Sequence, residues 1–149
     1  MTALEVARLF LFVREAGPNT GQRVEAIQRW CGGQPGESWC CYFATMVLDL
    51  VYAGASPIPR EGACETVRQL ALTNGWVVDV PQAGDVFLRV KDNHAHHIGF
   101  VTRIDSDGTV GTISGNTSAD GASANGDRVA EHDLHPAPGS IVYVSYPRG

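Results

Sequence analysis

The sequence contains no long apolar run and no cluster of basic residues. Of its 149 residues, 11 are basic and 16 are acidic, which gives a formal net charge of -5. No apolar stretch approaches the roughly 20 residues that a membrane-spanning helix requires. The acidic balance also argues against nucleic acid and against simple charge attraction to anionic membranes or wall polymers. We therefore expect no nucleic acid and no membrane as partner.

A cleaved export signal is also lacking. Glu5 and Arg8 stand where such a signal needs an unbroken apolar segment, and no small-residue cleavage site follows. Apolar residues instead recur at near-helical spacing, which predicts a helix from Leu4 to about Ala16. We expect synthesis in the cytoplasm, so that any role outside it depends on release or delivery.

Cysteine pairs with C-x-x-C spacing are absent. The sequence has four cysteines, at positions 31, 40, 41 and 64. A structural zinc site built from thiolates uses such pairs, so none is expected. An even number of cysteines suits disulfides in an exported chain, but without an export signal we expect free thiols.

Helical patterns fill the first half of the chain and strand patterns fill the second. Further helices are predicted around Val24 to Cys31, after Ser38 as N-cap, and over Cys64 to Leu72. Short β-branched runs predict strands at 76–80, 85–90, 97–104, 110–113 and 141–144, with a long surface loop at 115–126. This order predicts one α+β domain over residues 1–149, with N-terminal helices packed on a C-terminal antiparallel sheet.

One cysteine and one histidine stand where catalysis could use them. The third helix is apolar nearly all round, so we expect it to be buried, with Cys40 in its first turn. Unpaired N–H groups in a first turn lower the pKa of a thiol. His97 begins a strand and can supply a base. Ser114 and Asn116 differ by two, which predicts that both project from one side of a strand toward that base.

Several short motifs resemble those of the CHAP family, the cysteine- and histidine-dependent amidohydrolases and peptidases of bacteria and their phages. The segment 38–43, Ser-Trp-Cys-Cys-Tyr-Phe, resembles the family's Trp-Cys-Ala-x-Phe motif. The segments 84–86, 97–101 and 113–117 are similar to its Gly-Asp strand, its His-x-Gly strand and its Ile-Glu-Gly-Asn-Thr segment. Segments 15–21 and 116–129 resemble one CHAP-like subgroup.

The resemblance implies a papain-like fold and a peptidoglycan substrate, cut at an amide or peptide bond. It implies Cys40 as nucleophile, His97 as base and Asn116 as the polar residue that follows the base in the sequence and orients it. It implies no cofactor and no metal. Ser114 departs from the family, because many members have a glutamate there that stabilises the imidazolium better. The expected settings are a phage endolysin released with a holin, a virion-associated hydrolase, or a toxin delivered by a secretion machine.

Other interpretations remain open. Cys41 is a rival nucleophile, although it lies about 100° round the helix and is expected in the core. Trp39 is a candidate to contact substrate or to pack in the core, and Asn19 is a candidate to contact substrate or to hold a turn. Gln34 has the spacing of an oxyanion-hole glutamine, and the alternative is a polar loop residue.

Two alternative functions follow from single features of the sequence. Ser114 is compatible with a catalytically silent wall-binding module. The cluster of His94, His96 and His97, completed by His132 or His135, would suit a metallohydrolase.

Overall fold

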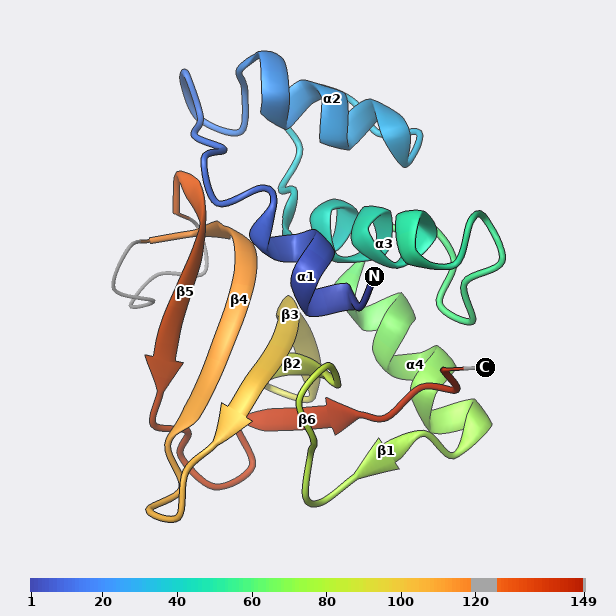
Figure 1. Ribbon diagram of the computed structural model, residues 1–149, viewed down its shortest axis with the longest axis vertical. Coiled ribbons are helices and arrows are strands. Elements are labelled where there is room, and N and C mark those ends of the chain that lie inside the picture. Colours follow the sequence, from blue (N-terminus) through green and yellow to red (C-terminus); the bar gives the residue numbers. More distant parts are fainter. Residues whose placement is uncertain (119–125, 149) are drawn as a thin grey trace.

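The computed structural model describes residues 1–118 and 126–148 and consists of four helices and one sheet (Figure 1). The helices are α1 (Ala3–Arg8), α2 (Gln22–Trp30), α3 (Cys40–Val51) and α4 (Cys64–Asn74). The strands are β1 (Val77–Val78), β2 (Val86–Lys91), β3 (His94–Ile104), β4 (Val110–Thr117), β5 (Arg128–Leu134) and β6 (Ile141–Val144). The strand order is β1-β6-β2-β3-β4-β5 and neighbouring strands are antiparallel. The predicted α+β class is therefore confirmed.

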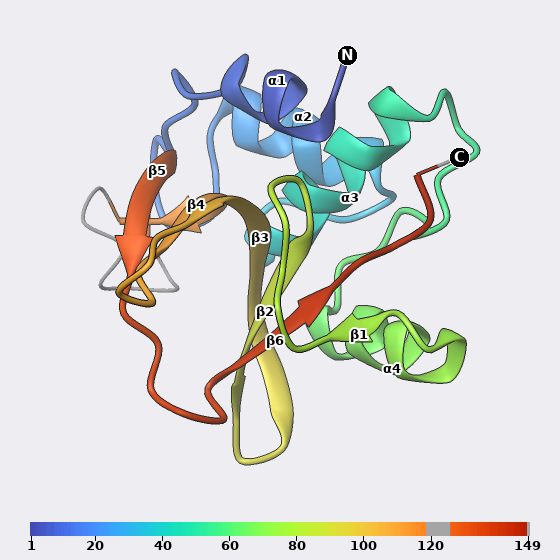
Figure 2. The ribbon, with the colours of Figure 1, turned by 60° about the horizontal axis from the view of Figure 1, so that its bottom comes forward.

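Helix α3 is the centre of the fold. Its residues from Cys40 to Leu48 are all buried, and it packs against β3, β4, α1 and α2. A helix that is apolar on every side is stable only when every side is covered, which explains this position. The prediction of a buried central helix is confirmed. Figure 2 shows α1 and α2 on the same side of the sheet as α3, with the β2–β3 hairpin projecting away from these helices.

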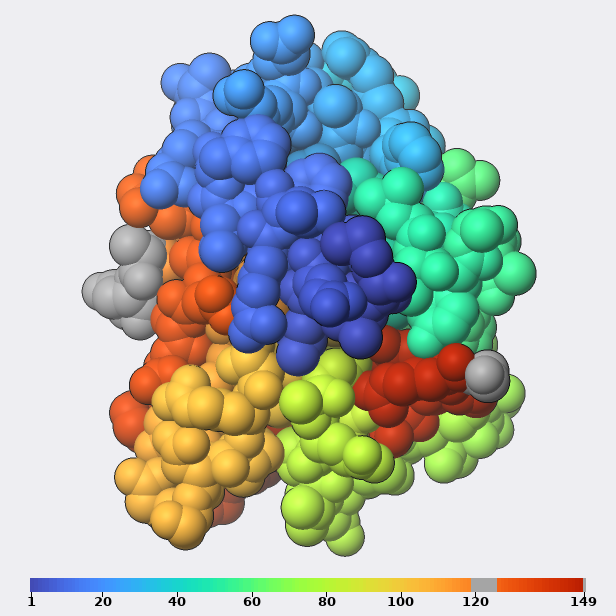
Figure 3. All heavy atoms as spheres, in the orientation of Figure 1, coloured from blue at the N-terminus to red at the C-terminus, as the bar shows by residue number. Residues whose placement is uncertain are grey.

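The N-terminal helix is shorter than expected. It begins with a capping box between Thr2 and Glu5 and ends at Arg8, whereas the apolar pattern predicted a helix to about Ala16. Beyond Arg8 the chain turns, and its backbone forms hydrogen bonds with residues at the start of β5. The N–H of Val129 donates to the carbonyl of Val13, and the N–H of Glu15 donates to the carbonyl of Asp127. These bonds replace helical ones, and this segment lies across the centre of the face seen in Figure 3.

The sheet differs from the prediction where β4 ends. Strand β5 was not predicted, and Gly115 to Thr117, assigned to a surface loop, are buried residues of β4. The backbone of Asn116 has φ 52°, and the register between β4 and β5 shifts between Ser114 and Thr117. The strand therefore bulges here, and the simple alternation expected of Ser114 and Asn116 is interrupted. The rest of that predicted loop, 119–125, lies outside the described residues.

Candidate active site

Cys40 is the first residue of α3 and is almost completely enclosed. Its exposed fraction is 3%, and the N-cap position is Trp39, not the predicted Ser38. The hydroxyl of Ser38 instead accepts a hydrogen bond of 2.9 Å from Nδ2 of Asn116. The helix therefore begins without a side-chain cap.

A second thiol touches Cys40. The Sγ atoms of Cys40 and Cys64 are 3.7 Å apart, and Cys64 opens helix α4. The hydrogen bond with Cys64 and burial raise the pKa of the Cys40 thiol above its ordinary value, while His97 acts in the opposite direction. The expectation of a lowered pKa is therefore wrong, because the sulfur is dry and faces a neutral thiol.

His97 lies in β3 beside these thiols, with 1% of its surface exposed. Its Nε2 is 3.1 Å from Oγ of Ser114 on the neighbouring strand. Its Nδ1 is buried and makes no hydrogen bond among the described residues. Gly99 permits this approach of the two strands, since a Cβ there would lie 2.7 Å from Cβ of Ser114. Ser114 therefore occupies the place of the group that orients the imidazole.

Helix α4 fixes the start of the strand that carries His97. The carboxylate of Glu65 accepts a 2.8 Å hydrogen bond from the N–H of Ala95 and pairs with Arg68. Arg68 in turn donates to the carbonyl of Asn93 at 2.8 Å. Mainly through the bonds from Arg68, the pKa of Glu65 is lowered to about 2. The first residues of β3 are thus tied to the same helix that brings Cys64 to Cys40.

Asn116 does not contact His97 by a hydrogen bond, contrary to prediction. Its Nδ2 is used by Ser38, and its Oδ1 is buried without a hydrogen-bond partner among the described residues. The left-handed backbone at this position turns the side chain away from the face that carries Ser114. Of the two polar residues predicted to orient the imidazole, the structure brings only Ser114 to it.

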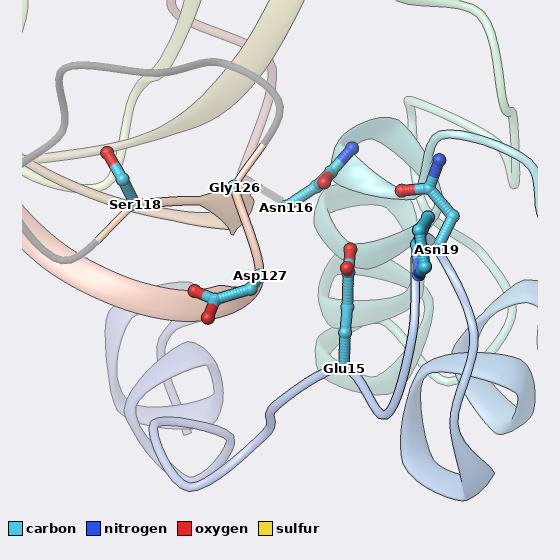
Figure 4. A pocket seen from close by; sticks show the side chains of 7 residues that line it. Glu15, Asn19, Asn116, Ser118, Gly126 and Asp127 are labelled. Carbon is cyan, nitrogen blue, oxygen red and sulfur yellow. The ribbon is translucent and has the colours of Figure 1, made fainter.

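A cavity opens on the other side of Asn116. Its volume is about 640 Å³, and it is lined by Glu15, Pro18, Asn19, Asn116, Ser118, Gly126 and Asp127. In Figure 4 the Glu15 carboxylate points toward Asn116, with Asn19 on one side and Asp127 on the other. Two carboxylates and two amides make this a place for hydrogen-bonding or cationic groups. Asn19 was predicted as a candidate substrate contact, whereas Glu15 and Asp127 were not predicted from the sequence.

Two further predicted substrate contacts lie elsewhere. Trp39 is fully buried, and its Nε1 donates to Glu15 at 2.8 Å, so only the packing role fits. Gln34 lies in an exposed loop, where its backbone N–H bonds to the Glu37 carboxylate. Neither side chain faces the cavity. Cys64, by contrast, lies at the candidate nucleophile, because its sulfur is 3.7 Å from that of Cys40.

The remaining cysteines and histidines have separate surroundings. All four cysteines are free thiols, as predicted, and Cys41 is fully buried in the core. His94 and His96 are exposed, whereas Nδ1 of His135 lies 3.3 Å from the Thr109 hydroxyl. Within residues 1–118 and 126–148, no three His, Cys, Asp or Glu side chains gather as a metal site would require. The metallohydrolase alternative therefore gains no support.

The fold thus places a buried cysteine at the start of a central helix, beside a histidine on an antiparallel sheet. The CHAP domain family model matches residues 32–116, more than half of the chain, and includes Cys40, His97 and Ser114. The chain therefore belongs to the CHAP family, whose members are amidase- and peptidase-type hydrolases of peptidoglycan. No curated protein matches the sequence. No helix in the described part of the chain is long and apolar enough to cross a bilayer.

Proposed function

We propose that this chain is a cell-wall hydrolase that cleaves an amide or peptide bond of peptidoglycan by a thiol mechanism. Cys40 is the nucleophile and His97 is its general base and acid. One observation carries the proposal: the helix start that presents Cys40 faces a buried His97 whose Nε2 is already engaged by Ser114 at 3.1 Å. A nucleophile, a base and a group that orients the base are the three parts that such chemistry requires.

The first step is attack of the Cys40 sulfur on the substrate carbonyl carbon. Because burial favours the neutral thiol, His97 removes the proton as the S–C bond forms. With Nε2 held by Ser114, Nδ1 is the nitrogen left to accept it. The tetrahedral oxyanion is stabilised in part by the backbone N–H of Cys40, which lies in the first turn of α3.

Collapse of that intermediate breaks the C–N bond. The imidazolium of His97 gives its proton to the leaving amine, and a thioester on Cys40 remains. Water, deprotonated by His97, then attacks the thioester and releases the carboxylic acid and the thiol. Ser114 keeps the ring in one orientation through both proton transfers, although a neutral hydroxyl stabilises the imidazolium less than a carboxylate would.

We place the substrate in the cavity lined by Glu15, Asn19, Asn116 and Asp127. The cavity reaches Asn116, which is bonded to Ser38, two residues before Cys40. This chain of contacts supports a binding surface near the start of α3. A role as a phage endolysin, a virion-associated hydrolase or a delivered toxin, with holin, virion or secretion machinery as partner, stays a prediction.

The test is digestion of purified peptidoglycan by wild type, Cys40→Ala and Cys41→Ala, with released fragments identified by mass spectrometry. Cys41 is the matched control, because it is a buried thiol one residue away in the same helix. We expect wild type and Cys41→Ala to release the same fragments, whose ends identify the bond, and Cys40→Ala to release none. Absence of fragments from several wall types with correctly folded wild type would instead favour a silent wall-binding module.

A further inference from the structure

Two buried thiols from different helices meet at the candidate nucleophile. Cys40 and Cys64 are the first residues of α3 and α4, and their sulfurs are 3.7 Å apart. Their exposed fractions are 3% and 8%, and both are free. In the proposed mechanism Cys40 is the nucleophile and Cys64 has no role. A second thiol held against a nucleophilic one is positioned to react with any oxidised form of it.

The other two cysteines are differently placed. The Cys31 thiol donates to the carbonyl of Tyr42 at 3.3 Å, away from Cys40. Cys41 follows Cys40 on the helix and is enclosed by the core, and its thiol also interacts with that of Cys64, so the peptide map must assign the link to Cys40 or to Cys41. The sulfurs of a disulfide are about 2.05 Å apart, so Cys40 and Cys64 must approach by roughly 1.7 Å. Rotation of the two side chains about their Cα–Cβ bonds can supply this movement.

We propose that Cys40 and Cys64 form a reversible oxidation site, at which hydrogen peroxide converts the two thiols into a disulfide and so blocks the nucleophile. The predicted loss of hydrolysis rests on the proposed function, whereas formation of the disulfide does not. Both sulfurs are enclosed, so a small neutral oxidant suits the site better than a bulky disulfide reagent.

The chemistry proceeds in two balanced steps. His97 takes the proton of Cys40, and the sulfur attacks one peroxide oxygen, so that the O–O bond breaks and a sulfenic acid and water form. The sulfur of Cys64 then attacks the sulfur of Cys40. The S–O bond breaks, the S–S bond forms, and the leaving hydroxide takes the Cys64 proton as a second water. Two thiols are oxidised by two electrons and one peroxide is reduced.

Cys64 also determines what happens after excess oxidation. A sulfenic acid without a neighbouring thiol reacts again with peroxide and becomes a sulfinic acid, which ordinary thiols do not reduce. With Cys64 at contact distance, condensation to the disulfide competes with that second oxidation. The pair therefore makes inactivation reversible.

The test uses purified, reduced protein treated with hydrogen peroxide, alkylated and digested with trypsin. Cleavage after Arg60 separates the peptide 30–60, with Cys31, Cys40 and Cys41, from the peptide 61–68, with Cys64. We expect these two peptides to be joined, with fragment ions that place the link on Cys40. Dithiothreitol should separate them and restore wall digestion. Cys41→Ala should form the same link.

Variants at position 64 extend the test. In Cys64→Ala, and in Cys64→Ser should the alanine variant not fold, peroxide should leave Cys40 as sulfinic acid and dithiothreitol should not restore digestion. The proposal would be overturned if the peptides of peroxide-treated wild type carried sulfinic acid on Cys40 and an alkyl group on Cys64. The alkyl group would show that the Cys64 thiol had remained reduced. If the link forms but the reduced wild type digests no wall, the proposed function is wrong and the oxidation site is supported. If the reduced wild type digests wall but no link forms, the oxidation site is wrong and the proposed function is supported.

Discussion

The enclosed cluster of Cys40, His97 and Ser114 and the open cavity beside it differ in almost every physical property. The cluster is almost fully buried, and contact with Cys64 together with burial raises the pKa of the Cys40 thiol. The cavity is lined by two carboxylates and two amides. Strand β4 links them, because Ser114 faces the imidazole and Asn116, two residues later, reaches the cavity. The difference indicates that bond cleavage and substrate recognition belong to separate surfaces, joined by one bulge.

If cleavage and recognition belong to separate surfaces, loss of the base should lower turnover strongly even though the cavity is unchanged. We expect His97→Ala to lower the rate of wall digestion by about 1,000-fold, the range typical of general acid–base catalysis. His96→Ala is the matched control, since His96 is the exposed neighbour on the same strand. Rates are compared on soluble wall fragments after circular dichroism shows both variants folded. Similar losses in both variants would contradict the assignment.

Removal of the Ser114 hydroxyl probes the cluster more gently. Ser114→Ala deletes the 3.1 Å contact with Nε2 of His97, and we expect kcat to fall about 10-fold, the value of one hydrogen bond, with KM nearly unchanged. Thr112→Val is the control, because Thr112 is also buried in β4 but bonds to the carbonyl of His132. A rise in KM with kcat unchanged would instead indicate that Ser114 contributes to substrate binding.

The cavity side of the comparison is tested at Asn19. Asn19→Gly removes the side chain from the cavity, and glycine keeps the φ of 52° without strain. We expect KM to rise about three-fold and kcat to stay constant, since a polar contact contributes under about 1 kcal/mol. Asn93→Gly is the control, because Asn93 has φ 57° on the β2–β3 turn. An effect on kcat alone would break the proposed division.

The smallest effect concerns the support of the cluster. The pKa of Glu65 is about 2 in the folded chain, well below its unfolded value near 4.5. A lowered pKa contributes stability that is present above pH 4.5 and is lost as the pH falls toward 2. The melting temperature of wild type should therefore fall across this window, and that of Glu65→Gln should fall less. Equal declines in thermal scans would show that Glu65 does not hold β3.

Local sequence patterns predicted the class of the fold and the residues of the cluster, but not how they pair. The apolar third helix and the β-branched runs predicted a buried α3 on an antiparallel sheet, because burial imposes those patterns. Alternation also suggested that Ser114 and Asn116 share a face. It failed because Asn116 takes a left-handed backbone in a bulge, and that depends on the pairing of β4 with β5.

Contacts between distant segments explain the other differences. Val13 and Glu15 leave the helical pattern because their backbone bonds to residues 127–129, which no local pattern reveals. The same pairing brings Glu15 and Asp127 to one cavity. The contact of Cys64 with Cys40 likewise depends on how α4 packs against β3. A first-turn cysteine predicts a lowered pKa only when its other neighbours are known.

The most direct test of the central claim is alkylation of the enzyme with iodoacetamide while wall digestion and modification of each thiol are followed together. We expect activity to fall in proportion to the fraction of Cys40 that is modified and to reach zero when modification is complete. Modification of Cys31, which is the most exposed of the four thiols, should leave digestion unchanged. Continued digestion by protein whose Cys40 is fully alkylated would contradict a thiol mechanism at this site.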